Sequence, residues 1–267
     1  MRSVLALALI SCGGPDPGQG GDDAGGTIDA TTGGDAAELV DLDGDGLDDA
    51  HELRLATEYM PHISLVPDDG CKRSGLAVRV RPHPADPTKI LILYDHLFET
   101  DCGFNGHTGD NEAFGVAIDP AIPAPGGILA LRTASHQNTI CERVTECSTC
   151  GGSDERDACE LTAGRPMIYP SKDKHGQYAN LGKCGGGTCF DSCAANPERH
   201  VPPIANVGEP GKPLITNLTT QGFVNGAFGW TEAELMNLDP WGEVDFGSAG
   251  NVAEDMIDPE FEAGLCP

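Results

Sequence analysis

Twelve residues from Asp41 to Glu52 constrain the local fold more tightly than any other part of the chain. They match a metal-binding loop with carboxylates at positions 1, 3 and 5, glycine at 6, a carbonyl at 7, an oxygen ligand at 9 and glutamate at 12. The ligands at these positions are Asp41, Asp43, Asp45, Leu47, Asp49 and Glu52, and Gly46 supplies the turn. Oxygen-only ligands favour calcium over softer metals, so the sequence predicts a calcium site here.

The residues around this loop predict its immediate context. A helix is expected from Asp49 to Met60, because Pro61 ends the apolar pattern. Only residues 36–40 precede the loop, too few for a full entering helix, and Asp48 stands where paired loops carry an aliphatic residue. The segment 39–60 therefore resembles a lone EF-hand-like or dockerin-type loop and helix, which we expect to bind calcium more weakly than a paired loop.

The amino terminus has the pattern of an export signal. Arg2 is followed by an apolar run over residues 4–10, and the tetrad ending in Cys12 (Leu-Ile-Ser-Cys) resembles a bacterial lipobox. We therefore expect a signal peptide over residues 1–11, lipidation of Cys12 that anchors the protein to a membrane, and a location in the bacterial cell envelope. Residues 12–38 are rich in Gly and Asp and are predicted to be a flexible linker.

Charge narrows the class of partner. The chain carries 16 basic and 42 acidic residues, which gives a formal net charge of −26. A protein with this balance repels phosphate backbones and attracts divalent cations, so nucleic acid is not an expected partner.

Cysteine usage agrees with export. Of the 11 cysteines, Cys12 is assigned to lipidation, and the even remainder allows up to five disulfides in an oxidising compartment. The remaining cysteines all follow residue 70: Cys71, Cys102, Cys141, Cys147, Cys150, Cys159, Cys184, Cys189, Cys193 and Cys266. Their pairing is not readable from the sequence, and zinc held by Cys147-x-x-Cys150 or by Cys184 and Cys189 is an alternative.

Beyond residue 70 the pattern is mostly that of strands. Short β-rich runs over residues 76–81, 89–98, 113–119 and 127–133 are separated by turns containing Pro or Gly. The first run alternates, which predicts that Ala77, Arg79 and Arg81 face solvent. Residues 141–200 are expected to form long stapled loops, and a capping box at Thr231 predicts a helix to about Leu238. The predicted fold is mainly β, a disulfide-stapled β-sandwich with long loops over residues 61–267, preceded by the calcium loop and helix.

A second group of ligand-type residues lies near the middle of the chain. Asp110 and Glu112 are two residues apart on an extended segment, so both point to one face, and His107 precedes them. Glu99 and Asp101 lie upstream within reach across a hairpin. Three further polar residues follow in separate segments: His136, His175 and Tyr178.

The run Gly106-His-Thr-Gly-Asp-Asn-Glu112 resembles the Gly-His-x-x-Asp-Trp-Glu heptapeptide of necrosis- and ethylene-inducing-like proteins. It is also similar to the His-x-Gly-Asp-Trp-Glu segment of vacuolar-protein-sorting-like proteins of unknown function. Segments that agree with the second group lie on both sides, at 59–61, 135–136 and 165–178. Asn111 departs from both motifs, because it stands where they carry Trp.

The resemblance implies a β-sandwich with a divalent cation, calcium or magnesium, in a surface cavity. Carried over, it implicates His107, Asp110 and Glu112 as ligands, with Glu99 or Asp101 as the upstream carboxylate. His136, His175 and Tyr178 are then the expected walls of a ligand cavity.

These observations predict a lipid-anchored, exported calcium-binding protein whose second cation cavity binds a glycan, a lipid headgroup or a protein, without catalysis. One alternative is a metal-dependent hydrolase that uses the cluster of His107, Asp110 and Glu112. The sequence has neither a His-Glu-x-x-His metal motif nor a Gly-x-Ser-x-Gly nucleophile motif. A second alternative is a purely structural envelope lipoprotein.

Overall fold

The fold is taken from a computed structural model, which describes residues 39–71, 73–83, 86–104, 106, 108–136, 140–141, 143–150, 157–185, 190–209 and 211–214. Several sequence-based predictions lie outside these residues. They are the signal peptide, Cys12, the linker, His107, Cys189, Cys266 and the helix over residues 231–238.

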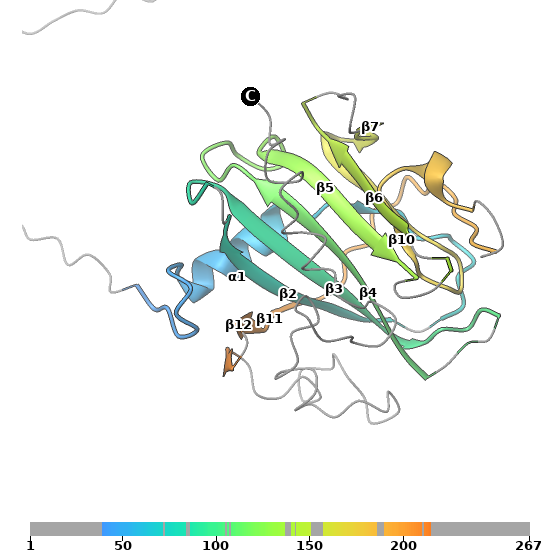
Figure 1. Cartoon of the computed structure of the whole chain (residues 1–267), viewed down its shortest axis with the longest axis horizontal. Helices are drawn as coiled ribbons and strands as arrows, with labels where there is room; N and C mark the ends of the chain where they lie inside the picture. Colours follow the sequence, from blue (N-terminus) through green and yellow to red (C-terminus); the bar gives the residue numbers. More distant parts are fainter. Residues whose placement is uncertain are drawn as a thin grey trace, which may run out of the picture. The chain divides into compact units, whose positions relative to one another are not determined.

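The main element is a seven-stranded sheet with the order β11-β2-β3-β4-β5-β6-β7 (Figure 1). Neighbouring strands from β2 to β6 are antiparallel, whereas β11 pairs with β2 and β7 pairs with β6 in parallel. The strands are β2 (Arg73–Pro82), β3 (Ile90–Thr100), β4 (Thr108–Ile118), β5 (Ile128–Ser135), β6 (Arg143–Ser148), β7 (Asp157–Ala158) and β11 (Ile204–Asn206). The four runs predicted as strands correspond to β2, β3, β4 and β5.

A second, smaller sheet completes the β-sandwich. It contains β1 (His62–Ile63), β8 (Leu161–Thr162), β9 (Arg165–Pro170) and β10 (Gln177–Tyr178). A hairpin of β12 (Gly208–Glu209) and β13 (Lys212–Pro213) and a short 3-10 helix, η1 (Leu181–Lys183), are the remaining elements. Residues 141–200 thus contain several short strands between their loops, and the prediction of loops alone was incomplete.

Alternation along β2, β3 and β4 builds the hydrophobic core. Ile92 and Tyr94 of β3 lie on the same face as Phe114 and Val116 of β4, and all four side chains are fully buried. The rings of Tyr94 and Phe114 stack with centroids 4.8 Å apart. This core also contains Ile168 of β9, so it joins the two sheets of the sandwich.

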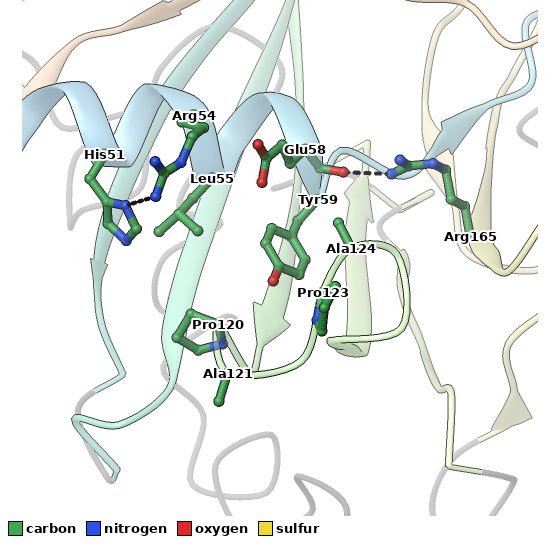
Figure 2. Close-up of a pocket in the computed structure, with 10 residues that line it drawn as sticks. All are labelled: His51, Arg54, Leu55, Glu58, Tyr59, Pro120, Ala121, Pro123, Ala124 and Arg165. Carbon is green, nitrogen blue, oxygen red and sulfur yellow. Dashed lines mark hydrogen bonds between the residues drawn. The ribbon is translucent and has the colours of Figure 1, made fainter. Parts of the chain in front are cut away.

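The helix α1 (Asp49–Glu58) is part of this core. It contacts β2 and β11, and the Tyr94 hydroxyl donates a hydrogen bond of 2.8 Å to the Ala56 carbonyl. Figure 2 shows Tyr59 directed from the end of α1 toward the loop between β4 and β5, where its hydroxyl donates to the Ile122 carbonyl at 2.6 Å. The helix is therefore fixed to the sandwich by buried apolar surface and by specific hydrogen bonds.

Two arginines cap the carboxyl end of α1. Arg165 donates to the carbonyls of Glu58 and Met60 at 2.8 and 2.9 Å, and the first of these bonds is drawn in Figure 2. Arg199 donates to the Met60 carbonyl at 2.8 Å. Positive charge at a helix carboxyl end complements the exposed carbonyls there. These contacts join α1 to the sandwich, and the compact unit that contains both begins at Leu39.

The prediction that one face of β2 is exposed to solvent was wrong. The Arg79 side chain is only 2% exposed, and its Nε donates to the Gly208 carbonyl at 2.7 Å. Arg81, also on that face, pairs with Glu209 through bonds of 2.9 and 3.0 Å. The β12–β13 hairpin covers these arginines, and a contact between residues so far apart in the chain leaves no trace in the local alternation.

Disulfides tie the loops to the sheets. The described pairs are Cys71–Cys102, Cys147–Cys159 and Cys184–Cys193, and Cys141 and Cys150 are also disulfide-bonded. Because Cys147 pairs with Cys159 and Cys184 with Cys193, these cysteines are not thiolate ligands and the zinc alternative is excluded for them in this oxidised state.

Two leucines of α1 allow a direct test of its role in the core. Leu55 is 3% exposed and Leu53 is 40% exposed. We expect Leu55→Ala to lower the free energy of unfolding by about 2–5 kcal/mol, because it leaves a cavity in the core. Leu53→Ala, the matched control, should change it by less than about 0.5 kcal/mol. Urea denaturation measures both, and equal effects would show that α1 is not part of the core.

Candidate cation sites

The carboxylates of the twelve-residue loop converge as the spacing predicts. Ligand oxygens of Asp41, Asp43 and Asp45 lie within 4.8 Å of one another, and the same holds for Asp43, Asp49 and Glu52. Because Asp43 belongs to both sets, the five side chains surround one small volume. A divalent cation there would meet only hard oxygen ligands, as calcium prefers.

Backbone hydrogen bonds hold the loop open around that volume. Asp41 accepts from the amides of Gly44 and Gly46 at 2.6 and 3.1 Å, and Asp45 accepts from the Leu47 amide at 2.8 Å. Gly46 has a φ of +98°, a conformation that glycine adopts without strain. The Leu47 side chain packs against the hydrophobic core, so its place in the loop is fixed from outside.

Asp48 explains why the loop has no aliphatic residue at position 8. Its side chain caps α1 by accepting from the His51 amide at 2.9 Å, and it also accepts from the Val40 amide at 3.1 Å. In this chain, position 8 therefore caps the start of the helix. In a paired EF-hand, the residue at this position contacts the second loop.

Several loop carboxylate oxygens are buried without a hydrogen-bond donor among the described residues. They are both oxygens of Asp43, one of Asp45 and one of Glu52, and the Asp43 and Glu52 side chains are 1% and 0% exposed. Burial and the neighbouring charge of Asp45 raise the pKa of Asp43 to about 6. Burial, with the charges of Asp45 and Asp43, raises the pKa of Glu52 to about 8 despite its hydrogen bond to Asn206. The site thus has an uncompensated negative charge that a cation would neutralise.

The second predicted cluster is centred on a buried histidine. His175 is 0% exposed, and its Nδ1 lies 2.7 Å from Asp110 Oδ2 while its Nε2 lies 3.5 Å from Asp69 Oδ2. Burial opposes the charged ring, but the hydrogen bonds to Asp110 and Asp69 raise the pKa of His175. The ring also stacks on Phe98 with centroids 3.7 Å apart. His175 therefore bridges two carboxylates at the base of the cluster.

Asp191 links the other predicted residues. Its Oδ2 lies 2.5 Å from His136 Nε2 and accepts a hydrogen bond from the Tyr178 hydroxyl. Burial raises the pKa of Asp191, but the hydrogen bonds from His136 and Tyr178 outweigh it and hold the pKa below its usual value. The structure thus brings His136 and Tyr178 together through a residue that the sequence reasoning missed. Asp191 lies within a cysteine-rich loop and carries no motif that marks it.

Among the described carboxyl groups of this cluster, Glu112 has the most strongly raised pKa. It is 1% exposed, its Oε2 has no donor among the described residues, and burial with the charges of Asp110 and Asp191 raises its pKa well above the usual value. Asp101 also contributes to this rise. It is buried and bonded to Lys174 at 2.6 Å, whereas Glu99 is partly exposed at the end of β3. Of the two upstream candidates, Asp101 is the buried one, and its charge acts on Glu112.

The described members of this second cluster do not bring three ligand atoms within 4.8 Å of one another. His107, the remaining predicted ligand, lies outside the described residues. Two residues of the cluster have left-handed backbone, with φ of +54° at His136 and +60° at His175. Non-glycine residues rarely adopt this conformation, and they do so most often at functional sites.

Two exposed aromatic side chains lie beside the cluster. Phe104 is 75% exposed and follows the Asp101 loop, and Phe190 is 82% exposed and precedes Asp191. Their ring centroids are 6.5 Å apart in an edge-on arrangement. We call this pair the aromatic rim.

Asp95 allows a test of buried charge on the opposite face of the sheet, where it lies close to Asn111. It is 1% exposed, and burial raises its pKa from 3.8 to about 7. The folded state therefore retains a proton that the unfolded state has lost, and stability should fall as the pH rises from about 4 to about 7.

We expect Asp95→Asn to reduce the fall in the free energy of unfolding between about pH 4 and about pH 7, by up to about 1.4 kcal/mol per pH unit. The reason is that the amide has no charge to bury. Glu58→Gln, a change at an exposed side chain, should leave the pH profile nearly unchanged. Chemical denaturation across this pH range measures both variants, and identical slopes for wild type and Asp95→Asn would contradict the prediction.

No family model matches this sequence, and no curated protein matches it. Among solved structures, one described as "Toxin fold for microbial attack and plant defense" is 14% identical, with a TM-score of 0.36 over 57% of this chain and 72% of that chain. NLPPya in complex with glucosamine is 16% identical, with a TM-score of 0.36 over 63% and 74%. A mutant of NLPPya is 14% identical, with a TM-score of 0.39 over 76% and 87%.

Proposed function

We propose that this chain is an exported, lipid-anchored calcium-binding protein whose β-sandwich has a second divalent-cation cavity that binds a ligand. The observation that carries the proposal is the burial of carboxylate oxygens without donors at both places, on Asp43 and Glu52 in the loop and on Glu112 in the sandwich. Buried charges in proteins are paired or coordinate metals.

At the loop, the proposed ligands are the side chains of Asp41, Asp43, Asp45, Asp49 and Glu52 with the Leu47 carbonyl. The raised pKa values of Asp43 and Glu52 support this assignment, because both reflect first the burial of negative charge and then repulsion from neighbouring carboxylates, and a cation relieves both. Calcium accepts six to eight oxygen ligands in flexible geometry, which suits this set better than the strict octahedron of magnesium.

In the sandwich, the proposed cation, calcium or magnesium, is held by Asp110, Glu112 and Asp101, with His107 as predicted from the sequence. The structure adds Asp191, whose Oδ1 is buried and has no donor among the described residues. His175 and Lys174 then act as fixed positive partners for Asp110 and Asp101.

The proposed ligand is a glycan or a lipid headgroup, and a protein is the third possibility. The aromatic rim supports a glycan, because a sugar ring packs against an exposed aromatic face while the cation binds its hydroxyl oxygens. Membrane attachment is proposed through lipidated Cys12. In the part of the chain that the structure describes, no helix is long and apolar enough to cross a bilayer.

Calorimetric titration of the full mature chain tests both cation sites. We expect two bound divalent ions, one lost in Glu52→Gln and the other lost in Glu112→Gln. Saturating the loop with calcium at about 100 times its Kd should raise the free energy of unfolding by about 2.7 kcal/mol, because the ion binds the folded state alone. Glu58→Gln, at an exposed carboxylate of the same helix, is the control and should keep both ions.

Retention of both ions in Glu52→Gln would refute the loop site. One ion that is insensitive to Glu112→Gln would refute the second site and favour a purely structural role for calcium.

The ligand is tested with glycan arrays and with liposomes of varied headgroup, each in calcium and in chelator. We expect binding that requires the divalent ion and that falls by about tenfold or more in the Phe104→Ser/Phe190→Ser double variant, since stacking on exposed rings is lost. Both side chains are largely exposed, so the melting temperature should stay within a few degrees of wild type. Unchanged binding in chelator would exclude a role for the cation in ligand recognition.

A further inference from the structure

A cavity separate from both cation sites lies where the start of β2 meets residues 196–201. Its volume is about 290 Å³, near the lower limit of small-molecule sites. Three basic residues line it, Arg73, Arg199 and His200, with Glu198 as its one acidic residue among those described. In a chain with a net charge of −26, a cavity lined by two arginines and a single acidic residue among those described is unusual.

Two side-chain nitrogens at this cavity have no hydrogen-bond partner among the described residues. Arg73 Nη1 is buried without a hydrogen-bond partner, although it forms an ion pair of 3.5 Å with Asp69 Oδ2, the oxygen that also faces His175. His200 Nε2 is likewise buried without a partner. A buried donor that lacks an acceptor is costly, so two of them at one cavity favour a bound acceptor there.

The surrounding contacts hold both groups in place. The His200 amide bonds to the Ile63 carbonyl at 3.0 Å, and the ring stacks on His96 with centroids 5.6 Å apart. Burial and the charge of Arg73 lower the pKa of His200 to about 4, so near neutral pH the ring is neutral and donates without adding charge. Arg199 is fixed by its bond to the Met60 carbonyl.

The rest of the cavity wall is formed by Asn196 and by four aliphatic residues, Leu65, Val66, Pro67 and Val201, and Val201 is 62% exposed. Nitrogen donors, among them the positive guanidinium group of Arg73, together with aliphatic side chains match a ligand with an anionic head and a short hydrocarbon body.

We propose that this cavity binds a small aliphatic monocarboxylate. The carboxylate accepts from Arg73 Nη1 and His200 Nε2, and the hydrocarbon chain lies against Leu65, Val66 and Pro67. The guanidinium group suits a carboxylate because its donors match the two oxygens. The proposal does not depend on either cation site.

The test uses the full mature chain with calcium present and three probes of matched size or charge: hexanoate, hexanol and inorganic phosphate. Calorimetry gives affinities, and the ¹⁵N resonance of His200 Nε2 reports binding at the proposed donor. We expect hexanoate to bind and to shift this resonance, and hexanol and phosphate to bind at least about tenfold more weakly, since each lacks one of the two interactions.

Three variants locate the site. Arg73→Gln should weaken hexanoate binding by about tenfold or more, because a charge-assisted hydrogen bond is lost. His200→Phe keeps a ring to stack on His96 and removes the donor, so it should also weaken binding. Glu198→Gln, the control on the same cavity, should leave binding unchanged or tighten it.

Absence of hexanoate binding in the folded wild-type chain would overturn the proposal, as would hexanol binding as tightly as hexanoate. Phosphate binding as tightly would overturn the assignment to an aliphatic carboxylate. If Arg73→Gln lowers the melting temperature, the location of the hexanoate site is decided by His200→Phe alone. Unchanged hexanoate affinity in His200→Phe would then refute the proposed site.

Discussion

Repulsion between buried carboxylates is the constraint on which the rest of this structure depends. The loop places Asp43 and Glu52 in the interior with Asp45 beside them, and the sandwich buries Asp110, Glu112 and Asp191. Each ionised carboxylate loses hydration free energy when it is buried, so the fold must compensate with positive charge, protons or a cation. Much of the described architecture around the two sites can be understood as a response to this requirement.

The two sites meet the requirement differently. In the sandwich, His175 and Lys174 pair with carboxylates directly, and the left-handed backbone at His175 holds its ring between Asp69 and Asp110. In the loop, the hydrogen-bond donors to the carboxylates are mostly backbone amides and Asn206, which orient the oxygens and add no positive charge. Arg81 and Lys212 line the same cavity as Asp43 and Asp45, but neither gives a hydrogen bond to the buried oxygens of Asp43.

Local pattern was sufficient for some features and insufficient for others. The convergence of the loop carboxylates could be predicted because their spacing within twelve residues places them around one volume. The strands β2 to β5 could be predicted because alternation is a local pattern. Arg79 was predicted to face solvent because the residue that buries it, Gly208, is distant in the sequence. Asp191 was not predicted because its contact with His136 depends on how distant loops pack. The attachment of α1 to the core also depends on remote residues, Tyr94, Arg165 and Arg199. Contacts of this kind have no period and no motif in the sequence.

The hydrogen bond between Glu52 and Asn206 joins residues 154 positions apart. Glu52 holds the last place in the loop, yet one of its oxygens is oriented by a side chain from β11, near the other end of the described fold. A chain that emerges from a ribosome with its amino end first presents the complete twelve-residue motif long before Asn206 arrives. The loop in its fully oriented form is consequently a late product of folding, because Asn206 orients Glu52 only after strand β11 has reached its place in the sheet.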